Sequence, residues 1–338
     1  MEAQATSRRP RRGIVFAVLA LIVLVMLLLS VLMWWWDTEP RLFDPVKVTQ
    51  VKMQDLQRPV SIGATTTVTL ITSVETLLDK RGGYLSNDKL PPGVLMDNLP
   101  NWEFGSLTAS RDLVRALRND FSRSQAQSTE DKDLADADPL LNSPNDRWLL
   151  PSSESQYRKA VRHLDGYLKR LGDPDDSSAH FYARADNLAD YLQLASSRLG
   201  SLSQRLSASV GQIRVGDVDG PATASTVGGG PTMGRMVKTP WLKLDDNFYE
   251  ARGYTWTLLE QLKAIQQDFG PILRSKHADI SLQQVIRELE DAQRPLRSPM
   301  VLNGSPFGFF ANHSLVMANY VSRANAAIID LRELLKRG

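Results

Sequence analysis

Residues 178–209, SAHFYARADNLADYLQLASSRLGSLSQRLSAS, place an apolar side chain at alternating intervals of four and three residues. The series is unbroken and consists of Phe181, Ala185, Leu188, Leu192, Ala195, Leu199, Leu202 and Leu206. In an α-helix this spacing gathers the apolar side chains on one stripe. It therefore predicts a long helix over residues 178–209 whose stripe packs against another helix.

Similar stripes occur through most of the chain after residue 64, and strand signals are scarce. The last stripe consists of Val321, Ala324, Ile328, Leu331 and Leu335. We therefore expect an all-α, elongated helical bundle over residues 64–338, because a helix of about 30 residues is about 45 Å long. Heptad stripes serve bundles within one chain and coiled coils between chains. Packing within the monomer is the simpler expectation, and a homo-oligomer through the heptad helices stays open.

The N-terminal 36 residues combine a basic arm with a long apolar run. Residues 1–13 contain four arginines, among them Arg11 and Arg12, and residues 14–36 carry no charge and end in Trp34, Trp35 and Trp36. About 20 apolar residues suffice to cross a bilayer as a helix, and tryptophan favours the interface between lipid and water. Residues 14–36 are thus predicted to be a transmembrane helix.

The alternative to a retained span is a cleaved signal peptide, whose apolar core is shorter, about 7–15 residues, and ends in a small-x-small site. The apolar run here is longer and is followed by WWWDTEP at 34–40. A signal anchor is therefore preferred. Because basic residues near a span stay inside, we expect a cytoplasmic N-terminus and a periplasmic C-terminal domain.

Residues 37–63 look like a stalk, since Pro40, Pro45 and Pro59 punctuate them and Val46, Val48 and Val51 could form a short extended piece. The domain over 64–338 is interrupted by a glycine-rich stretch, at about 211–240, that we expect to be flexible. Residues 37–338 carry 36 basic and 37 acidic side chains, a balance that argues against nucleic-acid binding. The absence of cysteine excludes disulfides and thiol chemistry.

Two interruptions of the helical pattern, residues 81–105 and 295–313, mix turn formers with aromatic residues. Structured loops of this length often carry function. They supply a candidate interaction surface made of Tyr84, Trp102, Glu103, Phe104, Phe307, Phe309 and Phe310. The alternative, which we consider the simpler one, is that these aromatics only cap the ends of the bundle.

Motifs for catalysis, cofactors and metals are missing. Residues 229–236 have the glycine spacing of a P-loop without its lysine and its Ser/Thr, and the four histidines are scattered. A glycan-cleaving pair needs only two carboxylates, for which Glu103 and Asp97 are the first candidates. The sequence predicts no catalytic residue, no cofactor site and no metal site.

Four runs carry a resemblance to a known family: ETLLDKRGGYLSND at 75–88, PPG at 91–93, NLPNWEFG at 98–105 and DFSRSQ at 120–125. They are similar to a proteobacterial family of membrane-anchored proteins, domain-of-unknown-function family 2333. The resemblance covers most of the chain. It implies a Gram-negative inner-membrane setting and supplies no activity or catalytic residue.

These observations favour a non-enzymatic scaffold or protein-interaction module of the cell envelope, anchored in the inner membrane and contacting envelope or membrane proteins. One alternative is a periplasmic ligand-binding or sensory module that acts through a membrane partner, since a short inner arm cannot relay a signal alone. A third is a hydrolase of envelope polymers.

Overall fold

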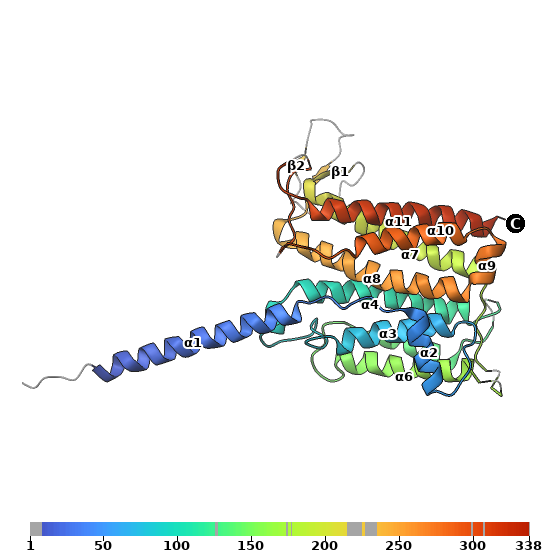
Figure 1. Ribbon diagram of the computed structural model, residues 1–338, viewed down its shortest axis with the longest axis horizontal. Coiled ribbons are helices and arrows are strands. Elements are labelled where there is room, and N and C mark those ends of the chain that lie inside the picture. Colours follow the sequence, from blue (N-terminus) through green and yellow to red (C-terminus); the bar gives the residue numbers. More distant parts are fainter. Residues whose placement is uncertain are drawn as a thin grey trace, which may run out of the picture.

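The computed structural model describes residues 9–125, 128–173, 175–176, 178–214, 225–226, 235–298, 300–306 and 308–337 of the chain. The regular secondary structure of this part is almost entirely helical, which confirms the predicted all-α class. One long helix, α1 (Arg9–Trp36), projects from a bundle whose long helices lie roughly along a common axis (Figure 1). The molecule is therefore elongated.

The bundle has two halves, in each of which helices pack side by side. The first half contains α2 (Pro45–Asp55), α3 (Ala64–Asp79), α4 (Asn98–Ala116), α5 (Lys132–Leu141) and α6 (Ser153–Leu171). The second half contains α7 (Ala185–Ser207), α8 (Leu244–Asp268), α9 (Gly270–Ser275), α10 (Asp279–Ala292) and α11 (His313–Lys336). The predicted stripe of α7 packs on α11 within the same chain.

Short elements complete the described part. The helical turns are η1 (Gly93–Leu95), the π-helical η2 (Leu117–Phe121), η3 (Ala208–Val210) and η4 (Trp241–Lys243). An antiparallel sheet with the order β1–β3–β2 is formed by β1 (Gln212–Arg214), β2 (Ser225–Thr226) and β3 (Arg235–Val237). Residues 215–224 and 227–234 of the glycine-rich stretch, for which the sequence predicts flexibility, lie outside the described residues.

The two halves meet mainly where α4 packs along α8. A Cβ atom on Gly105 would lie 2.0 Å from the carbonyl oxygen of Glu250, and one on Gly253 would lie 1.8 Å from that of Trp102. Beside this contact, the hydroxyls of Ser106 and Thr257 are 2.5 Å apart. Only glycine permits such a close approach of two helix backbones. The reciprocal glycines therefore set the spacing of the two halves.

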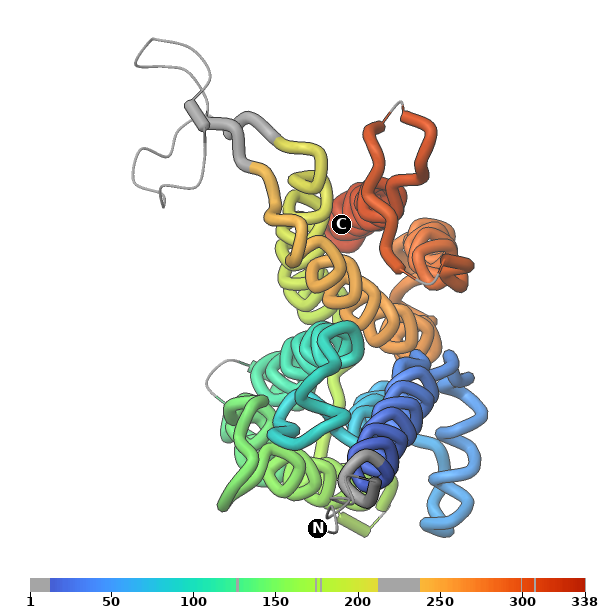
Figure 2. The backbone as a smooth tube through the Cα atoms, turned by 90° about the vertical axis from the view of Figure 1, so that its left-hand side faces the viewer, coloured from blue at the N-terminus to red at the C-terminus, as the bar shows by residue number. Residues whose placement is uncertain are grey.

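Successive long helices run in opposite directions, so their connections collect at the two ends of the bundle (Figures 1 and 2). The connections 80–97, 142–152, 238–243 and 293–312 lie at the end from which α1 projects, which we call the α1 end. The connections 56–63, 117–131, 172–184 and 269–278 lie at the opposite end, which we call the far end. Segments distant in sequence thus become neighbours.

The far end is closed by aromatic side chains. The rings of Phe121 and Phe269 lie 5.2 Å apart between centroids, and Phe181 packs on both at 5.4 Å and 5.6 Å. Asp268 at the end of α8 accepts hydrogen bonds from the backbone N–H and the hydroxyl of Thr66, each 2.7 Å long. The carboxylate therefore caps the first turn of α3, which satisfies an otherwise unpaired donor.

The structure corrects two details of the sequence analysis. The valines of the predicted stalk lie in α2 or at its edge rather than in an extended piece, because Asp44 caps the helix through the N–H groups of Val46 and Lys47 and Pro45 occupies its first position. The helix predicted over 178–209 begins at Ala185, because residues 178–184 run non-helically across the far end, where Phe181 enters the aromatic cluster.

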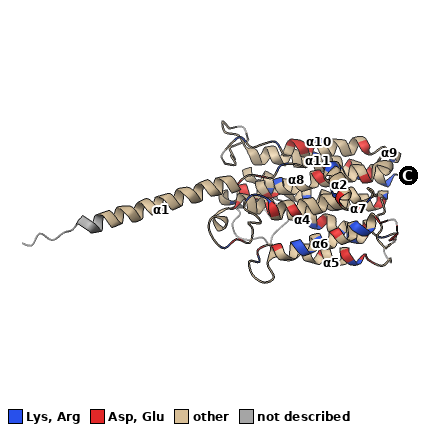
Figure 3. Cartoon of the chain, turned by 60° about the horizontal axis from the view of Figure 1, so that its bottom comes forward, with Lys and Arg blue, Asp and Glu red and all other residues tan. Residues whose placement is uncertain are grey.

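The structure has an uncharged α1 and a bundle with mixed charges, as the sequence indicated. From Gly13 to Trp36, α1 carries no charged residue, and it is long and apolar enough to cross a membrane. On the bundle, acidic and basic residues are interspersed (Figure 3).

Candidate functional site

The segment after α1 is fastened to the bundle by a partly buried ion pair at the α1 end. Arg252 of α8 donates from Nε to Glu39 at 2.7 Å, and a second guanidinium nitrogen contacts the same carboxylate at 2.5 Å. Its remaining nitrogen donates to the carbonyl oxygens of Ala292 at 3.1 Å and Arg294 at 3.0 Å. Arg252 thus joins the post-α1 segment, α8 and the end of α10.

Aromatic contacts extend this fastening on both sides of Glu39. The Phe43 ring meets the Trp256 ring edge-on with centroids 5.7 Å apart. At the end of α1, Trp36 packs against the core, and the Arg81 guanidinium lies 5.7 Å from the centre of the Trp35 ring. A guanidinium over an aromatic face is attracted by the ring quadrupole. Residues 37–44 therefore follow the bundle surface and are not a free stalk.

The loop after α3 is held by a second buried ion pair. Glu103 of α4 is fully buried, and its Oε1 lies 2.5 Å from Nζ of Lys80. The same carboxylate accepts hydrogen bonds from the backbone N–H groups of Leu85 and Ser86, both 2.8 Å long, and from the Ser86 hydroxyl at 2.5 Å. Lys80 also donates to the carbonyl of Gly83, so both charges are paired.

The burial and pairing of Glu103 decide whether it could form a catalytic acid pair with Asp97. Burial raises the pKa of Glu103, with Lys80 and the hydrogen bonds acting in the opposite direction. Four donors already occupy the two carboxylate oxygens, and no part of the side chain is accessible to a substrate. Asp97 lies exposed just before α4. Glu103 in this structure fastens the loop and does not pair with Asp97 as a catalytic acid.

The structure separates the members of the predicted interaction surface. Tyr84, Trp102 and Glu103 are buried in the first half of the bundle, where Trp102 meets the Trp256 ring at 5.2 Å. Their burial agrees with the capping alternative and removes them from any exposed surface. Phe104 is partly exposed on α4, and Phe307 lies outside the described residues.

Phe309 and Phe310 are the most exposed described members of the predicted surface, at 99% and 69%. Their loop is ordered by its own hydrogen bonds: the N–H of Gly304 donates to the carbonyl of Ala311 at 3.0 Å, and the Asn312 side chain donates to the carbonyl of Gly304 at 2.7 Å. The loop therefore presents both rings at the α1 end.

Of the predicted anchor residues, Trp34 and Trp35 are exposed and Trp36 is half-buried. The side chains of Arg11 and Arg12 lie outside the described residues, although the backbone at both positions is helical. Within the part of the chain that the structure describes, no three histidine or carboxylate side chains gather as a metal site would require. Most of the P-loop-like stretch falls outside that part.

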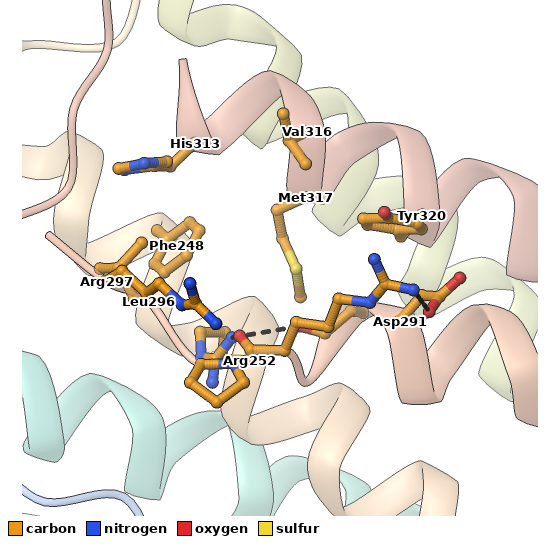
Figure 4. Close-up of a pocket in the computed structure, with 12 residues that line it drawn as sticks. Phe248, Arg252, Asp291, Leu296, Arg297, His313, Val316, Met317 and Tyr320 are labelled. Atoms are coloured by element: carbon orange, nitrogen blue, oxygen red, sulfur yellow. Dashed lines mark hydrogen bonds and ion pairs between the residues drawn. The ribbon is translucent and has the colours of Figure 1, made fainter. Parts of the chain in front are cut away.

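A cavity of about 240 Å³ opens at the α1 end between the start of α8, the end of α10 and the start of α11 (Figure 4). Its walls are largely apolar and include Phe248, Leu296, Val316, Met317 and Tyr320. Its polar side chains are Arg252, Asp291, Arg294, Arg297 and His313. The sequence analysis did not identify this cavity, because its walls come from three segments that only the tertiary fold brings together.

The cations of the cavity differ in what they already bind. Arg252 is held by Glu39, and Arg294 pairs with Asp291 at 2.6 Å. Arg297 makes no hydrogen bond or ion pair within the described residues and is exposed. Apolar walls beside an unpaired guanidinium are chemically suited to a molecule with an apolar body and an anionic group.

His313 adds a donor to the cavity. Its Nδ1 accepts a hydrogen bond from the N–H of Leu302 at 2.9 Å, so in the neutral ring the proton lies on Nε2. Burial lowers the pKa of His313, which favours the neutral ring at neutral pH.

Comparison with known proteins identifies one family. The family described as an uncharacterised protein conserved in bacteria, domain of unknown function 2333, matches residues 9–338, nearly the whole chain. No curated protein and no solved structure matches the chain.

Proposed function

We propose that this chain, which belongs to the uncharacterised bacterial family DUF2333, is a membrane-anchored scaffold or protein-interaction module of the Gram-negative envelope. In this proposal α1 crosses the inner membrane once, with the basic arm in the cytoplasm and the bundle in the periplasm. The bundle then acts by contact with envelope or membrane proteins.

The observation that carries the proposal is the rigid connection between α1 and the bundle. The Arg252–Glu39 pair and the Phe43–Trp256 contact hold residues 37–44 along the bundle, and Trp36 continues the packing to the last turn of α1. A freely tethered domain could rotate above the membrane. A fastened bundle presents the same surfaces to its surroundings at a defined height, as a scaffold requires.

A topology and crosslinking experiment tests this function. The full chain would be produced in a Gram-negative host with an alkaline phosphatase reporter, active only outside the cytoplasm, at the C-terminus. A photoreactive residue at Phe104 or Val316, both exposed on helices of the bundle, would capture partners. We expect an active reporter and one discrete crosslinked partner protein.

The matched control is Glu39→Gln, which loosens the fastening without touching either crosslinking position. We expect the crosslink to weaken in this variant while the reporter stays active. An inactive reporter, or a chain that is monomeric and gives no crosslinked protein at either position, would contradict the proposal.

The cavity favours a second candidate function, a ligand-binding module for anionic amphiphiles. In this second proposal, the apolar walls would bind the apolar body of the ligand and the unpaired Arg297 would bind its anionic group. A ligand that binds only the folded state raises the melting temperature. We expect dodecyl phosphate to raise that of the full chain in neutral detergent more than dodecanol does, and Arg297→Gln to remove the difference. An equal shift by both compounds would exclude a specific anion site.

A further inference from the structure

Four connections at the α1 end expose large apolar side chains, although they come from widely separated parts of the sequence. The most exposed are Leu150 at 97%, Trp241 at 78% and Phe309 at 99%. The full set is Leu90, Val94, Leu95, Trp148, Leu149, Leu150, Trp241, Leu242, Met300, Phe309 and Phe310. Large apolar side chains that are exposed together in one region of a protein mark contact surfaces.

Two of these connections are fastened to each other, so their side chains are presented together. Asn87 donates from its side chain to the carbonyl of Arg147 at 2.9 Å and to Glu154 at 2.8 Å. Ser153 accepts from the N–H of Arg147 at 3.0 Å. The connection that carries Trp148, Leu149 and Leu150 is therefore held against the one that carries Leu90, Val94 and Leu95.

The connection 80–97 lies beside the last turn of α1, which fixes its position along that helix. Arg81 lies over the Trp35 ring, and a Cβ atom on Gly82 would lie 2.8 Å from the Trp36 ring. The left-handed backbone of Gly82, with φ of +83°, permits this contact. Tryptophans that end a spanning helix favour the interface between lipid and water. The exposed loop residues therefore lie near the level of that interface (Figure 1).

The four connections at the α1 end carry more exposed basic residues than acidic residues. The exposed basic residues of the four connections are Arg81, Lys89, Arg147, Lys238, Lys243, Arg294 and Arg297. The acidic residues of the same connections are Asp88, Asp97 and Asp146. The helix ends that adjoin these connections add the acidic residues Asp245, Asp246 and Asp291, the last of which pairs with Arg294 at 2.6 Å. Basic side chains around apolar tips are the combination that binds an anionic lipid surface.

We propose that the α1 end of the bundle rests on the bilayer, with its four connections inserted into the headgroup and upper acyl region of a membrane that contains anionic lipids. This proposal rests on the membrane anchoring proposed above. A lipid surface accounts at once for the shared position of the tips at the α1 end, their apolar character and the exposed basic residues that the connections carry.

Depth measurement on single-cysteine variants tests the proposal directly, because the natural chain has no cysteine. The full chain would be spin-labelled at Leu95→Cys, Leu150→Cys, Leu242→Cys or Phe309→Cys. Each variant would then be reconstituted, without any other membrane protein, in nanodiscs that contain anionic lipids. The matched control is Ile280→Cys at the far end, an equally apolar and 74% exposed position. A label at Val25→Cys in α1 reports on the span itself. Helix content from circular dichroism confirms folding of each variant.

We expect the loop labels to collide with dissolved oxygen more often, and with a water-soluble nickel complex several-fold less often, than the Ile280→Cys label. Replacing anionic by zwitterionic lipid should reduce this protection. Loop labels as accessible to nickel as Ile280→Cys, with Val25→Cys protected, would overturn lipid docking and leave the anchoring intact. A nickel-accessible Val25→Cys label would instead overturn the anchoring.

Discussion

The two ends of the bundle place aromatic side chains in opposite surroundings. At the far end, Phe121 and Phe269 are fully buried around Phe181. At the α1 end, Trp241 and Phe309 are exposed. Both ends consist of connections between helices, so the difference does not follow from loop position alone.

The far end is covered because one connection crosses it. Residues 178–184 lie over the helix ends, and the N–H of Tyr182 donates to the carbonyl of Phe121 at 2.6 Å. At the α1 end, the loop hydrogen bonds hold Phe309 and Phe310 outward. The chain therefore covers one end of the bundle with its own residues and leaves aromatic side chains exposed at the other.

The largest expected effect concerns the helix crossing on which both ends depend. We expect Gly253→Ala to lower the free energy of unfolding by about 4 kcal/mol or more, because its Cβ would lie 1.8 Å from the Trp102 carbonyl oxygen. The control is Gly200→Ala in α7, whose Cβ would meet its nearest atom at 3.7 Å. Alanine favours a helix over glycine by about 0.5–1 kcal/mol. Urea unfolding followed by circular dichroism compares the two; equal effects would contradict the close crossing.

A matched pair of phenylalanine substitutions sharpens the comparison of the ends. Phe269→Ala removes a fully buried ring at the far end, so we expect a loss of about 4 kcal/mol in unfolding free energy. Phe309→Ala removes an exposed ring at the α1 end, so in detergent we expect a change below about 0.5 kcal/mol. Melting curves of both variants measure the difference. A large loss for Phe309→Ala would show that its ring supports the fold.

A buried carboxyl group provides a pH-dependent prediction. Burial raises the pKa of Glu260, which lies on α8, to about 7 from 4.5, and neither of its buried carboxylate oxygens has a hydrogen-bond donor among the described residues. Well below pH 4.5 the carboxyl is neutral in both states; as the pH rises from 4.5 to 7, it ionises mainly in the unfolded state. The folded chain should thus lose about 3 kcal/mol of stability from this group over that interval.

Glu260→Gln tests this assignment, because its amide cannot ionise. The urea midpoint of the variant minus that of the natural chain is the quantity to compare at the two pH values. We expect this difference to be larger at pH 8 than at pH 4.5, because only the natural chain carries the buried carboxyl. If the two chains keep the same difference at both pH values, the buried carboxyl does not titrate as expected.

The ion pair that fastens the post-α1 segment gives the smallest of the main effects. Glu39→Gln leaves the nearly buried Arg252 guanidinium without its anion, and we expect a loss of about 2 kcal/mol. Asp79→Asn breaks the exposed pair with Arg158, for which we expect about 0.5 kcal/mol or less. Melting temperatures measured in low and high salt should separate the two. Equal losses would mean that Glu39 contributes no more than a surface charge.

The helical class and the membrane-type helix followed from local patterns. The stripe from Leu188 to Leu206 predicts α7, and the uncharged run from residue 14 to 36 predicts the span-length helix, because side-chain spacing and helix length are local properties. The same spacing misplaced the start of α7, since only packing at the far end draws residues 178–184 out of the helix.

The candidate site was harder to predict, because burial is not local. Trp102 and Phe309 both lie in aromatic, turn-rich stretches, yet one is buried beside Trp256 and the other is exposed. The cavity around Arg297 and the ion pair between Arg252 and Glu39 join segments far apart in the chain. Contacts between segments so far apart leave no periodic pattern in the sequence from which they could be predicted.

Side-chain order along the chain was thus sufficient for the kind of structure and for the apolar, uncharged α1, since helix periodicity and span length depend on neighbouring residues alone. Long-range packing was needed to decide which aromatic residues stay exposed and that the connections 80–97, 142–152, 238–243 and 293–312 share the end next to Trp35 and Trp36. The physical reason is that exposure and shared position arise only when the antiparallel helices, spaced by Gly105 and Gly253, bring distant turns together.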